Sequence, residues 1–305
     1  MKNDCCPVCH SGSSSTFYTF EEGYLVENCE DCAHYYSKFS ETDSAKLYGE
    51  EDEVYRVVDN RKSAYSKIIE YEYAKVLKQI RKQYPPGSGI LDFGSGKGVF
   101  LNLAAKFGYR AVGIETAAER ARFAREKYGA TVIQSEYSGG KIEGRQFDVI
   151  TLFHVLEHLH RPKEILSSLI QDNLKDNGLL IVEVPNLYSW QAAIAKNRWM
   201  HLDIPRHISH FTPEKLQDLS RDLNLKIIRN EYLSFHLGIL GMCQSLLSLF
   251  GYEQKIIKNL KQYDFKLMIL LIFILPLAFV MELVAAAFKK GGIIRIYCLY
   301  SIPKG

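Results

Sequence analysis

Residues 89–100 read GILDFGSGKGVF, and this stretch decides the fold. The run Gly89–Phe93 is short and apolar, which predicts a buried strand, and Val99–Phe107 has the pattern of a helix. The loop between them is rich in glycine, so its backbone can come close to a ligand. A strand, a glycine loop and a helix in this order are typical of the carboxyl edge of a doubly wound parallel α/β sheet.

Two acidic residues indicate what kind of ligand the loop binds. A dinucleotide fingerprint needs a glycine where this chain has Val99. Asp92 lies two residues before the first glycine, where its carboxylate would repel a pyrophosphate and attract an ammonium or a sulfonium. Glu115 ends the next predicted strand, 111–115, close to the offset of about 20 residues expected for an acid that accepts ribose hydroxyls. The sequence therefore predicts a site for a positively charged adenosine ligand.

The chain resembles the class I S-adenosylmethionine-dependent methyltransferases, in their small-molecule and glycan branch, over residues 40–232. ILDFGSGKGVF at 90–100 looks like their first motif and GIE at 113–115 like their second. FDVITLFHVLEHLHRP at 147–162 and GLLIVEVPN at 178–186 look like their fourth and fifth strands. The resemblance implies a seven-stranded Rossmann-like sheet that binds S-adenosylmethionine through Asp92, Gly94, Ser95, Gly96, Gly98, Glu115 and Phe153. The chain departs from the family near Gln134, where family members often have an aspartate that binds the adenine amine.

The residues expected to act on the acceptor follow the fourth and fifth strands. Methyl transfer to a hydroxyl requires alignment of the acceptor and removal of a proton. Six of the nine histidines lie between positions 154 and 210, and the segments that hold them leave the carboxyl edge of the sheet. The candidates are His154, Glu157, His158 and His207, with His154 and His158 on one face of a helical turn.

Two alternatives remain open for this cluster. A divalent metal ion could be held by His154, Glu157, His158 and a later histidine. Some relatives in quinone and RNA 3′-end methylation have Glu-x-x-Glu-His here, and this chain shares only Glu157-His158 with them. Alternatively, these side chains cap helices and line the cleft without chemistry.

The first 40 residues hold two C-x-x-C pairs, Cys6 with Cys9 and Cys29 with Cys32, separated by nineteen residues. This spacing predicts a four-thiolate zinc site, structural because four protein ligands leave no open position. The fourth ligand stays open, because other residues that can bind zinc lie nearby in the sequence: Cys5, His10 and His34. Reduced thiols or a redox pair are the alternatives. The polar N-terminus is not a secretory signal, so we expect no disulfide framework.

The predicted last two strands, 225–232 and 293–300, are separated by about 60 mostly apolar residues. Because both strands belong to one sheet, the chain must cross a membrane an even number of times or not at all. Residues 253–266 carry four lysines and predict a basic amphipathic helix on a membrane surface, with Lys289 and Lys290 at the headgroups. Pro276 is expected to kink the segment beside it. A two-span hairpin, a lid or a dimer interface are the alternatives.

These signals divide the chain into a zinc ribbon (1–40), a helical linker or lid (41–86), a donor-binding core (87–232), a membrane-seeking insertion (233–291) and a final core strand (292–305). We expect a cytoplasmic enzyme, peripheral or monotopic at the inner face of a membrane, that methylates a small-molecule, glycan or lipid-linked acceptor.

Two other functions are alternatives to this one. A zinc-ribbon RNA methyltransferase is disfavoured by the net charge of +3 and by FHVL where amino-group methylation uses an Asn/Asp-Pro-Pro-Tyr loop. The other alternative is a membrane scaffold that keeps the donor fold without turnover.

Overall fold

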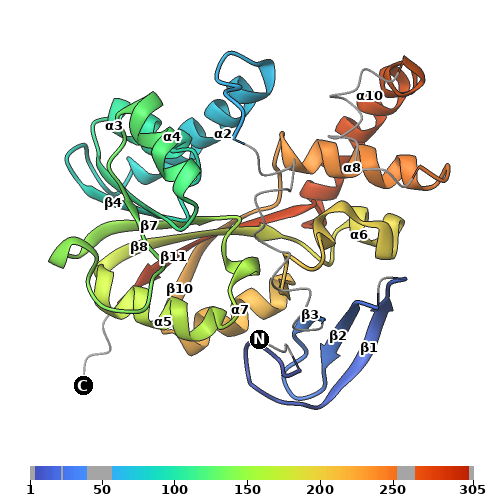
Figure 1. Ribbon diagram of the computed structural model, residues 1–305, viewed down its shortest axis with the longest axis horizontal. Coiled ribbons are helices and arrows are strands. Elements are labelled where there is room, and N and C mark those ends of the chain that lie inside the picture. Colours follow the sequence, from blue (N-terminus) through green and yellow to red (C-terminus); the bar gives the residue numbers. More distant parts are fainter. Residues whose placement is uncertain (1–3, 22, 40–56, 253–264, 302–305) are drawn as a thin grey trace.

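The core of the protein is a seven-stranded sheet in the order β6-β5-β4-β7-β8-β11-β10 (Figure 1). The structure is a computed structural model that describes residues 4–21, 23–39, 57–252 and 265–301. Five parallel strands are β4 (Gly89–Phe93), β5 (Arg110–Glu115), β6 (Val132–Gln134), β7 (Phe147–Phe153) and β8 (Leu174–Pro185). The last strand, β11 (Ile293–Tyr300), lies antiparallel between β8 and β10 (Leu225–Glu231). The predicted doubly wound α/β fold and its seven-stranded sheet are thereby confirmed.

Helices cover both faces of this sheet, which explains why its central strands are apolar at most positions rather than at alternate ones. Ile90 and Val149 face a layer that contains α2 (Ala64–Ile80) and α3 (Val99–Lys106). Their neighbours Leu91 and Ile150 face the opposite layer. Figure 1 shows α4 (Ala118–Tyr128) beside α3, and α5 (Pro162–Asn173) with α7 (Pro213–Asp222) across the sheet. The chain order reverses at β4, so the carboxyl ends of β4, β5 and β7 form the ligand-binding edge.

The N-terminal module is joined to the core by a shared sheet. Its strands β1 (Ser14–Thr19), β2 (Leu25–Cys29) and β3 (Tyr35–Lys38) continue into β9 (Ser209–His210), which follows the fifth core strand by more than twenty residues. Tyr35 pairs with His210 and Tyr36 with Ser209. The module is therefore built into the segment that was predicted to carry an acceptor-side histidine.

A helical group stands at one end of the sheet (Figure 1). It comprises α6 (Trp190–Ala195), α8 (Leu237–Ser248) and α10 (Phe265–Ala287), and α10 continues through Pro276. Most side chains of α8 are buried, whereas Ile272 and Phe273 of α10 are about 70% exposed. In the described part of the chain, Leu270–Ala287 is the one helical window long and apolar enough to cross a membrane. The basic helix predicted at 253–266 falls almost entirely outside the described residues.

Candidate functional site

Asp92 is a buried carboxylate at the carboxyl edge of β4. Its Oδ1 accepts a hydrogen bond of 2.7 Å from Thr151 Oγ1 on the adjacent strand β7. Burial, and next to it the negative charge of Glu115, raises the pKa of Asp92 to about 7. No cation contacts this carboxylate among the residues that the structure describes. A ligand that brings an ammonium to this point would compensate the buried charge.

Glu115 reaches the same edge from β5, and its carboxylate faces the glycine loop. One oxygen accepts from the Gly96 amide at 2.7 Å and the other from the Ala117 amide at 2.9 Å. The two acids predicted to hold the donor therefore lie on adjacent strands, at the paired ends of β4 and β5.

The three loop glycines serve different purposes. All have a positive φ, which disfavours any side chain. A Cβ on Gly94 would lie 2.4 Å from a methyl of Val155, and one on Gly98 would lie 2.7 Å from the Cβ of Ala124. A Cβ on Gly96 would meet nothing within 4 Å. Gly94 and Gly98 are thus required by packing, and Gly96 leaves room for a ligand.

Two further predicted donor residues have side chains that point into the protein. Ser95 Oγ is buried against β5, where a Cβ on Gly113 would lie 2.5 Å away. The ring of Phe153 packs at 5.0 Å from the rings of Tyr73 and Phe100, in the layer of α2 and α3. The Ser95 amide donates to the Ile114 carbonyl at 3.0 Å and its carbonyl accepts from the Gly98 amide at 3.0 Å. Ser95 is therefore held by the loop and β5, as Phe153 is held by the helix layer.

His154 follows β7 directly and is held between two acids. Its Nε2 lies 2.9 Å from Glu183 Oε1 on β8, and its Nδ1 lies 3.4 Å from Glu157 Oε1. Its φ of 56° is in the left-handed region, an unusual conformation that often marks functional positions. Burial alone would lower the pKa of His154, but the bonds to Glu157 and Glu183 and their charges raise it to about 10. His154 is therefore an imidazolium at neutral pH and donates protons rather than accepting them.

Glu157, His158 and His207 form a second group whose ligand atoms all lie within 4.8 Å of one another. The helical turn covers only Leu156–His158, so His154 precedes it and reaches the group only through Glu157. Glu157 is 1% exposed, and its oxygens accept no hydrogen bond of good geometry from the described residues. Burial raises the pKa of Glu157, but the contact with protonated His154 and its charge hold that pKa below the ordinary value, so Glu157 is a carboxylate with lone pairs left for a ligand.

The two histidines of this group are oriented by backbone carbonyls. His158 Nδ1 lies 3.0 Å from the Arg206 carbonyl and His207 Nδ1 lies 2.8 Å from the His201 carbonyl. A carbonyl can only accept, so both Nδ1 atoms carry hydrogen. Burial lowers the pKa of His207 to about 4, so its Nε2 is an unprotonated acceptor at neutral pH. The residues present fit either a proton-accepting site or a divalent metal ion bound by one carboxylate and two imidazoles.

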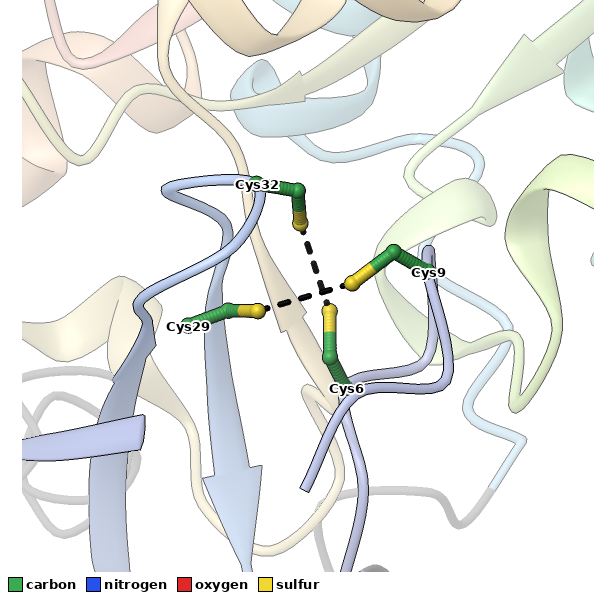
Figure 2. Close-up of side chains that lie close together, drawn as sticks. All are labelled: Cys6, Cys9, Cys29 and Cys32. Atoms are coloured by element: carbon green, nitrogen blue, oxygen red, sulfur yellow. Dashed lines mark hydrogen bonds between the residues drawn. The ribbon is translucent and has the colours of Figure 1, made fainter. Parts of the chain in front are cut away.

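The four predicted zinc ligands converge at the base of the N-terminal module (Figure 2). Cys6 Sγ lies 3.6 Å from Cys32 Sγ, and Cys9 Sγ lies 3.5 Å from Cys29 Sγ. A tetrahedral site with Zn–S bonds of about 2.3 Å has edges of about 3.8 Å, so these separations fit Zn²⁺.

Among the described residues, the cluster of metal-ligand atoms contains the four cysteines and not the other ligand types near them in sequence. Cys5 is exposed and His10 pairs with Glu164 on α5. His34 is fully buried with its ring 5.2 Å from that of Phe211.

Sequence reasoning missed a buried ionic network beside His154. Glu183 pairs with Arg295 of β11, and Arg295 Nη1 also lies 2.9 Å from Glu231 Oε2. Across the site, Glu72 of α2 pairs with His236 just before α8. Glu183 and Arg295 stand inside the otherwise apolar runs LLIVEVPN and IIRIYCLY. A charged residue within a fully buried strand is a signal that could have identified both.

The strand order, the antiparallel last strand between the fifth and sixth, and the acids at the ends of β4 and β5 define the class I methyltransferase fold. The crystal structure of magnesium protoporphyrin IX methyltransferase from Synechocystis PCC 6803 with bound SAH is similar, with a TM-score of 0.50 and 12% sequence identity. That likeness covers 85% of this chain and 94% of the other and concerns the fold.

A family model described as a methyltransferase domain matches residues 65–230, more than half of the sequence. The chain therefore belongs to this family, among the class I S-adenosylmethionine-dependent methyltransferases.

Two curated relatives match part of the chain. The mitochondrial ubiquinone biosynthesis O-methyltransferase of Schizosaccharomyces pombe is 31% identical over 103 residues, which are 32% of this chain and 37% of that protein. The ubiquinone biosynthesis O-methyltransferase of Roseobacter denitrificans is 32% identical over 147 residues, 44% of this chain and 58% of the relative. This chain thus spans less than two thirds of the length of these relatives.

Proposed function

We propose that this chain transfers the methyl group of S-adenosylmethionine to a hydroxyl of an amphiphilic small molecule, lipid-linked or carrying a glycan, at a membrane surface. The observation that carries the proposal is the Glu157–His158–His207 group, in which Glu157 and His158 follow β7, the strand paired with that of Asp92. The printed names of the curated relatives, ubiquinone biosynthesis O-methyltransferases, favour a hydroxyl acceptor.

The donor would be held by the two acids at the sheet edge. The Asp92 carboxylate would pair with the donor's ammonium, and Glu115 would accept the ribose hydroxyls. The bonds of Glu115 to the Gly96 and Ala117 amides fix its carboxylate at the loop before the donor arrives. Open space above Gly96 permits close approach of the donor.

The acceptor hydroxyl must lose a proton during the displacement. The methyl carbon–sulfur bond breaks as the carbon–oxygen bond forms, and S-adenosylhomocysteine leaves as a neutral thioether. Glu157 and the neutral His207 are suited to take the proton, because protonated His154 has no acceptor nitrogen. A divalent ion held by Glu157, His158 and His207 would acidify the hydroxyl as a Lewis acid.

Replacing Glu157 by Gln is expected to reduce methyl transfer by about 100-fold, since a general base typically contributes that much or more. The assay incubates the full chain with methyl-labelled S-adenosylmethionine and a detergent-solubilised bacterial lipid extract, and measures label in the organic phase. Glu119→Gln, on the exposed surface of α4, is the matched control and should transfer label normally. Wild-type protein that binds S-adenosylhomocysteine but transfers no label to any extract would favour the scaffold alternative.

The helices α8 and α10 support a membrane-surface location. At about 1.5 Å per residue, the twelve residues of α8 extend about 18 Å, too short for a hydrocarbon core of about 30 Å. The strands on either side of this helical group belong to one sheet, so a single crossing by α10 is excluded. Trp190 stacks on Phe288 and Lys290 lies over the ring of Tyr188, the aromatic and basic residues typical of a membrane interface. We therefore place α10 along the interface, at the cytoplasmic face.

The double variant Ile272→Ser, Phe273→Ser is expected to lose most of its binding to anionic phospholipid vesicles. These two side chains are 67% and 72% exposed, and burial of each contributes roughly 1.5–3 kcal/mol. Flotation with vesicles of phosphatidylcholine and phosphatidylglycerol measures the bound fraction. Ile228→Ser, an exposed apolar residue on β10, is the control and should float like the wild type. Wild-type protein that stays at the bottom of the gradient and sediments as a dimer would support a dimer interface instead.

We further propose that the four-cysteine site holds one structural zinc ion. Purified protein is expected to contain one equivalent of zinc by atomic emission, because the four sulfurs lie within 4.8 Å of one another and two of their separations, 3.6 Å and 3.5 Å, are near the edge of a tetrahedral site. Cys9→Ser should lose the metal and unfold the N-terminal strands, whereas Cys5→Ser, an exposed neighbour outside the cluster, should keep it. Metal-free wild-type protein with protected N-terminal strands would rule the site out.

A further inference from the structure

Ser37 lies at the point where the N-terminal module meets the acceptor side of the core. It belongs to β3, the strand that pairs with β9, and it is fully buried. Its amide donates to the Ile208 carbonyl at 2.8 Å, and its Oγ donates to the His207 carbonyl at 2.7 Å. The same Oγ lies 2.9 Å from His210 Nε2. The side chain and amide of Ser37 thus contact three residues that are 170 or more positions later in the chain, His207 and His210 through Oγ and Ile208 through the backbone.

The chemistry of a hydroxyl fixes the direction of these bonds. Ser37 has one hydroxyl proton, and a carbonyl can only accept, so that proton goes to His207. The Oγ then accepts from His210, which must carry its hydrogen on Nε2. Ser37 therefore fixes both the backbone position of His207 and the tautomer of His210.

The segment that Ser37 holds is continuous with the Glu157 group. The Ile208 amide donates to the Glu157 carbonyl at 2.8 Å, so residues 207–210 bridge β3 and the turn after β7. The His207 ring packs at 4.7 Å from that of His158. A shift of β9 would therefore move one histidine of the group and the backbone of its carboxylate together.

Two other contacts join the module to the same segment. Val26, Trp199 and Leu202 share one buried cluster, so the face of the module's sheet forms the support under the residues that precede His207. Lys215 Nζ of α7 donates to the Cys32 carbonyl at 2.9 Å, which ties a cysteine turn to the helix after β9. The module is fastened on both sides of β9.

We infer that Ser37 is a positioning residue for His207, and that the four-cysteine module supports the acceptor-side group through β3. The structural part stands on the contacts alone, and the part that concerns turnover rests on the proposed methyl transfer. The module then serves the core directly. Donor binding at Asp92 and Glu115 does not depend on it, because neither residue contacts β3 or β9 among the described residues.

Hydrogen exchange by mass spectrometry on the full, metal-loaded chain tests the inference. Ser37→Ala is expected to speed amide exchange of residues 204–211 roughly tenfold, since it leaves a buried carbonyl and a ring N–H unpaired. Ser37→Thr keeps the hydroxyl and should restore protection. Ser209→Ala is the matched control, because that hydroxyl is equally buried on the same strand pair and makes no hydrogen bond to the described residues.

The affinity for S-adenosylhomocysteine and the zinc content should stay within twofold of wild type in all three variants. Unchanged exchange in Ser37→Ala, or an equal effect in Ser209→Ala, would overturn the positioning role. Should Ser37→Ala fail to accumulate, chelation of the wild type until zinc is measurably lost replaces it. Exchange of 204–211 must then rise while β4 and α3 stay protected, and continued protection of 204–211 would overturn the inference.

Turnover is a separate measurement in this design. With an active wild type, Ser37→Ala should lower kcat roughly tenfold and leave the KM for S-adenosylmethionine unchanged. An inactive wild type would count against the proposed methyl transfer, whereas the exchange data would still decide whether Ser37 positions His207.

Discussion

Asp92→Asn is expected to abolish donor binding and to make the unliganded protein more stable. The carboxylate is buried without a cation among the described residues, and its pKa of about 7 lies above the ordinary value of 3.8. That difference corresponds to at most about 4 kcal/mol of unfavourable free energy in the folded, charged state. Asparagine keeps an oxygen for the Thr151 hydroxyl and removes the charge. The residue is thus unfavourable for the fold and required for the ligand.

The sign of the pH dependence follows from the raised pKa. The charged form is penalised in the folded state, so the gain from Asp92→Asn is largest above pH 7 and disappears as the pH falls toward 3.8. Urea unfolding at pH 8 and pH 5 measures this difference in the free energy of unfolding. At pH 8, Asp92→Asn should be more stable than the wild type by on the order of 2–4 kcal/mol. In the wild type, Asp92 becomes protonated below pH 7. The affinity for S-adenosylhomocysteine, measured by calorimetry, should therefore fall by about tenfold from pH 8 to pH 6.

Asp148 provides the matched control for Asp92. It lies at the opposite end of β7, and Lys175 Nζ lies 2.8 Å from its Oδ1. Partial burial raises the pKa of Asp148, but the bonds from Lys175 and the Gly89 amide outweigh this effect and hold the pKa below the ordinary value. Asp148→Asn should therefore destabilise the protein slightly and leave S-adenosylhomocysteine binding intact. Equal affinity in Asp92→Asn and wild type at pH 8 would contradict the donor site.

The strands of the core could be predicted from local sequence because burial on both faces leaves a clear signal. The runs at 89–93 and 147–153 are mostly apolar segments next to polar turns, and the structure gives β4 and β7 these bounds. Within the described part of the helical linker expected at 41–86, α2 begins only at Ala64, because Ser63 Oγ caps the Ser66 amide. Its apolar face is irregular, since Ile68 is 41% exposed and Glu72 is buried.

Local sequence patterns did not predict the pairing of distant segments. His154, Glu157 and His158 share one short stretch, yet His154 is bound to Glu183 on β8 while His158 lies against His207. Spacing along the chain predicts a common helical face, and the left-handed backbone at His154 removes it. The pairing of β3 with β9 was likewise invisible, because a two-residue strand has no periodicity. These are long-range contacts, and they decide which histidine can accept a proton.

Glu183→Gln is expected to destabilise the protein by about 3–5 kcal/mol, because it leaves the buried Arg295 without its main counter-charge. Arg295 is 4% exposed and Glu183 is 1% exposed, so water cannot replace the lost partner. Glu231→Gln removes the other carboxylate that contacts Arg295 and is the control. Glu231 is 19% exposed at its side chain and does not contact His154, so its replacement should cost about 1 kcal/mol.

The same substitution should also change the titration of His154. The raised pKa of about 10 depends on Glu157 and Glu183 together, so Glu183→Gln should move the NMR-measured pKa of His154 downward. A pKa raised above 6.5 stabilises the fold below pH 6.5, and this contribution is lost as the pH rises through 10. The free energies of unfolding of the wild type and Glu183→Gln, measured in urea, should therefore differ less at pH 10 than at pH 6. The double variant Glu183→Gln, Arg295→Met should regain most of the stability at both pH values, because it removes the unpaired charge. A loss in Glu183→Gln no larger than that in Glu231→Gln would mean that the buried network does not hold His154 in its charged form.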